Sequence, residues 1–288
     1  MCDTVKDSVA RCHDRRAVAR ERVILAQAAL SDCRLCPQNC GIDRLAGETG
    51  WCRAGATARV FCAQVEVGEE PELIPTFAIA FSGCDMRCAF CITGQDSWNP
   101  QRGGVFDARS IAGKAAAALE AGARTVTIRG GEPTIHLPEA IRLVAALPSR
   151  ARLVWKTNAY MTSQARALLD GLFDVWVADY KFGNDSCAKR LAAIVDYQRP
   201  VQETLLWAGA RTELIVRHLL MPGHVDCCWE PVACWMARNL PAAKISLRCG
   251  FWPAWKARQH PELRGPVGAA DIQRALEIAQ CYKVQFIE

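Results

Sequence analysis

The sequence has no apolar run long enough to cross a bilayer, so we expect no membrane-spanning helix and no membrane partner. Its N-terminal region has no continuous apolar core beside a cleavage site, which argues against a secretory signal peptide. Acidic residues among the N-terminal arginines, such as Asp7 and Glu21, argue against a transit peptide. The formal charge of +5 is too small to require nucleic acid as a partner. We therefore expect a cytoplasmic protein.

Cysteine, in contrast, is abundant: the 288 residues include sixteen cysteines. A dense disulfide framework is typical of short, loop-rich secreted chains, and this chain is neither short nor expected to be secreted. Hydrophobic residues make up 51% of the sequence, so a sizeable core is available without disulfides. We therefore expect a reducing compartment in which thiolates bind metal.

Three of these cysteines, Cys84, Cys88 and Cys91, lie close together in the sequence. Three thiolates at this spacing can hold three corners of a [4Fe–4S] cube, whereas a cube built for electron transfer usually takes four cysteines. The fourth iron is then open to a small molecule. An aromatic residue, Phe90, directly precedes the last cysteine. The other interpretations of the motif are a zinc site and three unrelated buried cysteines.

This Cys-x3-Cys-x2-Cys motif resembles that of the radical S-adenosylmethionine (radical SAM) superfamily. The resemblance implies that the amino and carboxylate groups of SAM bind the open iron of the [4Fe–4S] cluster. It also implies that one electron, from a reducing partner such as flavodoxin or ferredoxin, cleaves SAM to methionine and a 5′-deoxyadenosyl radical. That radical abstracts hydrogen from a substrate that the motif does not identify, and the protein positions and shields the cofactor.

From residue 76 onward, apolar strand candidates alternate with helix candidates, which is typical of parallel βα units. The expected strands are Thr76–Ser82, Thr125–Arg129, Leu153–Thr157, Asp174–Asp179, Glu213–Leu220 and Lys244–Cys249. The expected helices are Asp107–Ala121, Leu137–Leu147, Ser163–Leu169, Asp185–Ala208, Glu230–Asn239 and Ala270–Gln280. Six units, with a further short strand at Lys283–Ile287, are too few for an eight-stranded barrel. The sequence therefore predicts an α/β fold with a partial (βα)6 TIM-type barrel over residues 76–288.

Reactive residues of a βα barrel collect at the carboxyl ends of its strands. The cysteine motif follows the first expected strand, and the turn Gly130-Gly131-Glu132-Pro133 follows the second. The resemblance implies that this turn contacts the methionyl ammonium group of SAM. At the third strand, alternation puts Lys156 and Asn158 on one face. Asn158 is a candidate cofactor-binding residue and Lys156 a candidate catalytic one, and the alternative for a lysine there is contact with solvent.

The next two strands supply the other candidate catalytic residues. Asp179 shares a face with Lys181, and the two either pair with each other or line the cavity. Arg217 and His218 are consecutive, so they point to opposite faces of a regular strand. At most one of them therefore faces the cavity.

We expect residues 1–30 to form a helical lead-in and residues 31–75 to form a small cysteine-rich metal-binding module before the barrel. The four cysteines of this module are Cys33, Cys36, Cys40 and Cys52. Four thiolates in a short segment can hold a structural zinc ion or a complete iron–sulfur cluster. We favour a second [4Fe–4S] cluster, because the barrel already requires iron–sulfur assembly.

Cys227 and Cys228, with Cys234, are a weaker candidate for a further metal site. Adjacent cysteines are awkward ligands for a single metal. Buried, inert thiols are the alternative interpretation.

The spacing of the four N-terminal cysteines is similar to that in the pyruvate formate-lyase activating enzyme-like branch of the superfamily, as are segments around Asn158, Asp179 and Val216. The name of the branch implies a glycyl-radical activase acting on a partner protein. Two departures, Ala159 in place of the usual glycine and Cys249 at the end of the sixth strand, favour direct modification of a small molecule or peptide. A non-catalytic iron–sulfur electron-transfer protein is the alternative from a different class.

Overall fold

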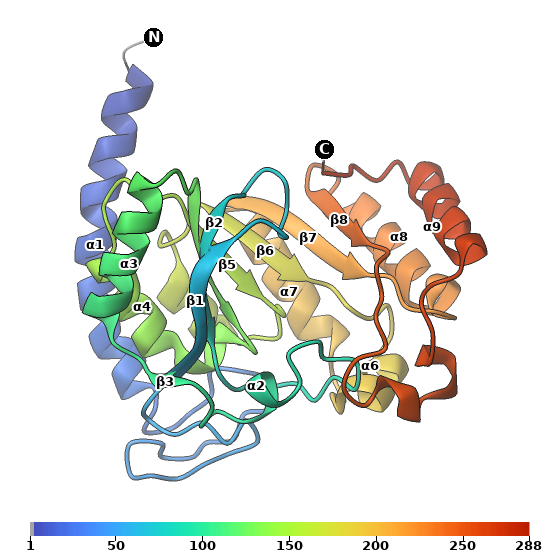
Figure 1. Ribbon diagram of the computed structural model, residues 1–288, viewed down its shortest axis with the longest axis horizontal. Coiled ribbons are helices and arrows are strands. Elements are labelled where there is room, and N and C mark those ends of the chain that lie inside the picture. Colours follow the sequence, from blue (N-terminus) through green and yellow to red (C-terminus); the bar gives the residue numbers. More distant parts are fainter. Residues whose placement is uncertain (1–2, 288) are drawn as a thin grey trace.

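The computed structural model describes residues 3–287, with side chains from Arg15 onward (Figure 1). Its strands are β1 (Arg59–Glu66), β2 (Thr76–Phe81), β3 (Gly104–Val105), β4 (Thr125–Gly130), β5 (Leu153–Thr157), β6 (Val175–Asp179), β7 (Glu213–Leu219) and β8 (Lys244–Arg248). They form one sheet in the order β3-β1-β2-β4-β5-β6-β7-β8. Strands β2 and β4 to β8 are parallel to one another, which confirms the predicted α/β fold and its partial barrel.

The parallel strands begin and end within one residue of their predicted bounds because each is a short apolar run that a polar or glycine-rich turn ends. In β2 every side chain is buried, as expected for a strand covered on both faces. The expected strand near the C-terminus is reduced to a single parallel bridge between Ile245 and Phe286.

The longer helices pack along the outside of the curved sheet, with α1, α3 and α4 together on one side and α8 and α9 on the other (Figure 1). Their bounds are α1 (Asp3–Ala28), α2 (Gln95–Trp98), α3 (Ala108–Glu120), α4 (Leu137–Ala146), α5 (Ser163–Leu169), α6 (Asp185–Ala192), α7 (Gln198–Gly209), α8 (Glu230–Asn239) and α9 (Ala269–Cys281). Side-chain caps begin three of them: Asp107 for α3, Thr162 for α5 and Asn184 for α6. Between the longer elements lie the short helix η1 (Pro133–His136), a π-helical turn η2 (Val225–Trp229), and two 3-10 turns, η3 (Ala257–Gln259) and η4 (Pro261–Leu263). No helix in the described part of the chain combines the length and apolar character needed to span a bilayer.

The prediction of one helix over Asp185–Ala208 is wrong, because the chain turns between α6 and α7. Ala193 ends α6 in a left-handed conformation with φ 57°. The Asp185 carboxylate then accepts hydrogen bonds from the backbone N–H groups of Tyr197 and Gln198, at 3.0 and 2.9 Å. These contacts tie the start of α7 to the first residue of α6 and fix the turn between the two helices.

Two strands, one before the barrel and one after its first strand, were not expected from the sequence. Strands β1 and β3 extend the sheet in antiparallel fashion beside β2. After β1, the chain enters the barrel interior, where Leu73 packs against Val154, Val177 and Ile215. The loops of residues 29–58 lie at the same end of the sheet as α2 and α6, at the lower edge of Figure 1. The carboxyl ends of the parallel strands and the cysteine-rich segment therefore meet at one end of the molecule.

Candidate functional site

The cysteine motif forms a loop that leaves β2 and is held by backbone contacts to the end of α6. Arg87 N donates to Ala192 O at 2.9 Å, and Ala89 N donates to Leu191 O at 2.8 Å. Gly83, with φ 91°, makes the turn at the start of the loop. The loop places the Cys84, Cys88 and Cys91 side chains on the wall of one cavity. Its shape is thus fixed by the barrel rather than by local helix or strand structure.

The donor set of this loop fits a cationic iron–sulfur cluster. Burial raises the pKa of Cys88 to about 12 and that of Cys84 well above its ordinary value. A bound metal centre lowers the pKa of a coordinating thiol and is the partner that would keep such thiolates ionised. The cavity that these cysteines line has a volume of about 740 Å³, which suits a cofactor together with part of a substrate.

The Gly130-Gly131 turn closes another side of the same cavity. An ideal Cβ on Gly131 would lie 2.1 Å from the carbonyl oxygen of Gly83, and one on Gly130 would lie 2.3 Å from that of Phe81. Only glycine therefore allows this turn to pack against the beginning of the cysteine loop. Glu132 and Pro133 lie buried behind the turn.

Glu132 connects the turn to the end of β5. Its carboxylate accepts hydrogen bonds from the Thr157 hydroxyl at 2.8 Å and from the Asn158 backbone N–H at 2.7 Å. It also accepts from the backbone N–H of Thr134 at 3.0 Å. These hydrogen bonds use the Glu132 carboxylate to hold the glycine turn in place. The backbone of Gly130 and Gly131, and not the Glu132 side chain, therefore faces the cavity.

Asn158 brings this network to the cysteine loop, because its side-chain amide donates to Asp85 Oδ1 at 2.7 Å. Burial and the neighbouring Glu132 raise the pKa of Asp85 to about 7. The same amide lies 3.9 Å from Cys84 Sγ. Asp85 was not predicted from the sequence, although its place directly after the first cysteine of the motif is a signal that could have identified it.

Charged side chains from strands β5, β6 and β7 and from one loop form the floor of the cavity. Lys156 from β5 and Arg217 from β7 both pair with Glu69, the latter at 3.2 Å. Asp179 at the end of β6 pairs with Lys181. Burial alone would raise the pKa of Glu69. The charges of Lys156 and Arg217 outweigh burial and lower this pKa to about 2.

Lys156, Asp179 and Arg217 therefore all lie at the cavity, with the aromatic Phe90 on its wall. Despite burial, Lys181 and Arg217 lower the pKa of Asp179, so this residue is a carboxylate at neutral pH. Glu69 was missed because its loop carries no motif; the only signal is two adjacent acidic residues before a proline.

His218 is the one candidate catalytic residue that the structure places away from this cavity. Its Nδ1 lies 2.7 Å from the carbonyl oxygen of Tyr180, and its ring packs against Trp229. The alternation of β7 turns Arg217 inward and His218 outward. We therefore assign His218 a role in packing rather than at the cavity.

The cysteine-rich segment of residues 31–58 lies against the cysteine loop. Gln38 Nε2 and Trp51 Nε1 donate to the carbonyl oxygen of Asp85, at 3.3 and 2.8 Å. Burial raises the pKa of Cys36, and nearby Asp85, Cys52 and Cys33 raise it further. Cys40 is exposed, with its Sγ 3.5 Å from the backbone nitrogen of Trp51. Three of the four predicted thiols of this segment thus interact with one another.

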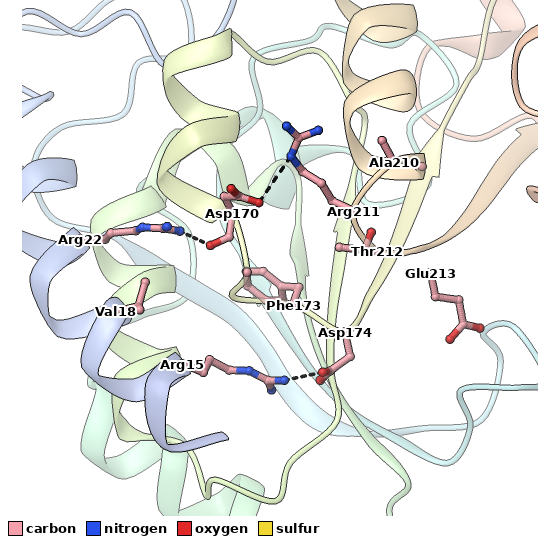
Figure 2. Close-up of a pocket in the computed structure, with 12 residues that line it drawn as sticks. Arg15, Val18, Arg22, Asp170, Phe173, Asp174, Ala210, Arg211, Thr212 and Glu213 are labelled. Carbon is pink, nitrogen blue, oxygen red and sulfur yellow. Dashed lines mark hydrogen bonds and ion pairs between the residues drawn. The ribbon is translucent and has the colours of Figure 1, made fainter. Parts of the chain in front are cut away.

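A second cavity of about 740 Å³ lies at the other end of the strands, between α1 and the loops that lead into β6 and β7 (Figure 2). Its charged groups are already paired: Arg15 with Asp174, and Arg211 with Asp170 at 3.6 Å. Arg22 donates to the backbone carbonyl of Asp170. These contacts fasten α1 to the barrel, and we assign the cavity no chemistry.

Comparisons with known proteins agree with this geometry. A family model described as the radical SAM superfamily matches residues 79–235. An uncharacterized protein of Methanocaldococcus jannaschii is 29% identical over 272 residues, which cover 92% of this chain and 79% of that protein.

Among solved structures, Streptococcus suis SuiB bound to the precursor peptide SuiA is similar in fold, with a TM-score of 0.54 and 15% identity. The similarity covers 71% of this chain and 45% of SuiB. SuiB bound to S-adenosylmethionine gives the same TM-score at 17% identity, over 70% of this chain and 47% of SuiB. This chain thus spans less than half the length of SuiB.

The family-model match extends over more than half of the chain and includes the three cysteines and the glycine turn that line the cavity. The family implies SAM and a [4Fe–4S] cluster as cofactors. The prediction of the superfamily is confirmed, and the activating enzyme-like branch stays a prediction. On this evidence the chain belongs to the radical SAM superfamily.

Proposed function

We propose that the protein is an enzyme that cleaves SAM reductively and abstracts hydrogen from a small-molecule or peptide substrate. The observation that carries this proposal is that three motif cysteines, the glycine turn and a charged floor all face one cavity. In this proposal Cys84, Cys88 and Cys91 hold a [4Fe–4S] cluster, which supplies the electron for cleavage when SAM is bound.

The protein's own residues position and shield the reacting groups. Gly130 and Gly131 present backbone to the ligand, as the turn of this family does toward the SAM ammonium group. Phe90 is buried between Phe182 and Phe251 and excludes water beside the last cysteine. Asn158, held by Glu132 and Asp85, keeps the end of β5 beside the cluster loop.

The charge of the cavity supports a substrate that carries an anionic group. Five cationic and two acidic side chains line it; these are Arg129, Lys156, Lys181, Arg217, Arg248, Glu69 and Asp179. Glu66 and Glu70, outside this lining, pair with Arg129 and Arg217, so the cations exceed the carboxylates by one. A cleft with an excess of one charge attracts ligands of the opposite sign. A carboxylate of an amino acid or peptide is the group we favour, and SuiB is similar in fold and binds a precursor peptide.

We further propose that Cys33, Cys36, Cys40 and Cys52 hold a second [4Fe–4S] cluster. Single metal ions need ligand atoms about 3.5–3.8 Å apart. Among the described residues, these four thiols do not form a group with all sulfur atoms within 4.8 Å, so they are not arranged around a single ion. We favour a cluster over a structural zinc ion because the barrel already requires iron–sulfur assembly. The contacts of Gln38 and Trp51 with Asp85 would couple this cluster's segment to the first one.

An anaerobic assay for 5′-deoxyadenosine tests the main proposal. Reduced protein and SAM should release 5′-deoxyadenosine and methionine, and Cys88→Ala should reduce the rate at least a hundredfold. Cys281→Ala, at an exposed position on α9, is the matched control and should retain activity. Turnover that survives Cys88→Ala would refute the cluster assignment, and no turnover in the iron-loaded wild type would favour the electron-transfer alternative.

Electron paramagnetic resonance separates direct modification from activation of a partner. Direct modification predicts a substrate-derived product and no stable radical on another protein. A persistent glycyl radical on a partner, formed only with SAM and this protein, would instead establish the activase function.

A further inference from the structure

Four metal-ligating side chains meet away from the SAM cavity: Cys187, His224, Cys227 and Cys228. Their ligand atoms all lie within 4.8 Å of one another. His224 Nδ1 is 3.6 Å from Cys187 Sγ and 3.4 Å from both Cys227 Sγ and Cys228 Sγ. Cys227 Sγ is 4.0 Å from Cys187 Sγ and 3.9 Å from Cys228 Sγ.

These separations fit one tetrahedral ion. Zinc binds cysteine sulfur at about 2.3 Å and histidine nitrogen at about 2.0–2.1 Å, so ligand pairs lie about 3.5–3.8 Å apart. The ligands of a four-iron cube surround the whole cluster and must be farther apart than this. Carboxylates, which calcium and magnesium require, are absent from the set.

We propose that Cys187, Cys227, Cys228 and Nδ1 of His224 bind a structural zinc ion. The inference does not depend on SAM chemistry. The sequence did suggest metal binding by Cys227 and Cys228, but with Cys234 as their partner. Cys234 lies instead in α8, where it interacts with Tyr282.

The π-helical turn η2 explains how two adjacent cysteines serve one ion. This turn begins directly after His224 and contains both Cys227 and Cys228. The backbone of a π turn is wound more widely than that of an α-helix, so successive side chains take different directions from those in an α-helix. Such turns are frequently found at functional sites. Cys187 approaches from α6, so the ion would join two segments that follow different strands of the barrel.

Polar groups around the tetrad suit thiolate ligands. Asn184 Nδ2 lies 3.4 Å from Cys187 Sγ and donates to the carbonyl oxygen of Cys227 at 2.7 Å. With Nδ1 on the ion, Nε2 of His224 carries the proton, and it lies 3.8 Å from the carboxylate of Glu262. A carboxylate on the far side of a ligating histidine is typical of zinc sites.

Arg190 also lies beside the tetrad. Three thiolates and one zinc ion leave a net charge of −1, and Arg190 pairs with Glu262, so that pair adds no net charge and the site keeps its charge of −1. Arg190 Nη2 lies 3.4 Å from His224 Nε2, and with Nε2 protonated both groups are donors that face the carboxylate of Glu262. Cys187, His224 and Cys228 are buried, whereas Cys227 is exposed and gives an ion a route from solvent.

The position of the site indicates what the zinc does. The last carbonyl groups of α6 accept hydrogen bonds from Arg87 and Ala89 of the cysteine loop. An ion bound to Cys187 would fasten α6 to the connection between β7 and α8. We therefore assign the zinc a bracing role behind the loop that holds the SAM-binding cluster.

Metal analysis of the full-length protein, purified without oxygen or added zinc, tests the site. Wild type should contain one zinc per chain beyond any in the N-terminal segment. Cys187→Ser and Cys228→Ser should each lose about one equivalent of zinc while retaining most of the iron. Cys234→Ser is the matched control and should keep its zinc.

Cobalt substitution gives a second readout that does not depend on comparing damaged variants. Co²⁺ in the wild type should show thiolate charge-transfer bands and tetrahedral d–d bands of high intensity. His224→Cys should still bind the ion, with its d–d bands shifted to longer wavelength by a fourth thiolate. Equal zinc in wild type and Cys187→Ser, or mononuclear iron or an iron–sulfur cluster at the tetrad, would overturn the assignment.

Discussion

Asn158 donates its side-chain amide to Asp85 Oδ1 at 2.7 Å, and its backbone N–H donates to Glu132 at 2.7 Å. One asparagine therefore holds two buried carboxylates, one from the cysteine loop and one from the glycine turn. The ends of β2, β4 and β5 are joined through this residue. The relationship explains why an uncharged amide, rather than an acid, is required there.

Asn158→Asp should place a third carboxylate beside Asp85 and Glu132. Loss of a buried hydrogen bond to a charged group costs about 1.5–3 kcal/mol, so 5′-deoxyadenosine formation should fall about 10- to 100-fold. Iron and sulfide per chain should be measured in the same samples, to separate cluster loss from poor SAM binding. Asn239→Asp, at the exposed end of α8, is the control. Wild-type turnover by Asn158→Asp would contradict the network.

Glu69 should make the stability of the protein depend on pH in the acid range. Its folded-state pKa of about 2 lies below the ordinary value of 4.5, because Lys156 and Arg217 favour the carboxylate. The stabilisation is thus present above about pH 4.5 and is lost as the pH falls toward 2. At neutral pH it amounts to about 3 kcal/mol.

Denaturation of wild type and Glu69→Gln at a series of pH values measures this contribution. The difference in free energy of unfolding should be constant between pH 8 and 5.5 and should shrink at lower pH. Glu277→Gln, at an exposed position on α9, should show no such difference. A difference between wild type and Glu69→Gln that grew on acidification would have the opposite sign to the one argued here.

The parts of this molecule that local patterns determine were predicted well. Strand β5 has the predicted bounds Leu153–Thr157, because the apolar Leu153, Val154 and Trp155 begin a short run of strand-forming residues that ends before Asn158. The cysteine loop and glycine turn were placed at one cavity because parallel strands bring their carboxyl ends together.

What escaped prediction depends on contacts between distant segments. Glu69 pairs with Lys156 across 87 positions of sequence, and no local pattern marks its loop. The tetrad was missed because Cys187 and His224 are 37 positions apart and belong to different βα units. The break between α6 and α7 is an exception, because it is set locally by Asp185 and by the left-handed Ala193. Pro200, in the first turn of α7, was a sequence signal against one continuous helix.

Ala193→Gly should stabilise the protein. Ala193 is exposed and has φ 57°, a left-handed conformation that costs an alanine about 1–2 kcal/mol and that glycine adopts freely at helix ends. After the entropy of glycine in the unfolded chain is subtracted, a gain of about 0.5–1 kcal/mol remains. It should appear as a rise of about 1–4 °C in the midpoint of thermal unfolding.

Ala188→Gly is the control for this substitution, because Ala188 is fully buried in the interior of the same helix. It should lower stability by about 1 kcal/mol or more. A destabilised Ala193→Gly would mean that the alanine methyl group makes contacts worth more than its backbone strain.

Gly131→Ala should disrupt the close backbone packing between the glycine turn and the cysteine loop. Gly131 N donates to Phe81 O, and Glu132 N donates to Gly83 O, both at 2.9 Å. A Cβ on Gly131 would meet Gly83 O at 2.1 Å and Ser97 Cα at 3.0 Å, and both obstacles are backbone atoms. The turn and the loop must then move apart. We expect at least a tenfold loss of 5′-deoxyadenosine formation, with lower iron content per chain.

Gly113→Ala provides a contrast within the same fold. Gly113 lies in the interior of α3, is exposed, and has no heavy atom within 4 Å of an added Cβ. The alanine should raise stability by about 1 kcal/mol through helix propensity, without changing iron content or turnover. If both variants behaved alike in iron content and turnover, the close approach at Gly131 would have no role in holding the cluster loop. If only Gly131→Ala lost iron, the contact between the two turns would be what keeps the three cysteines at the cavity.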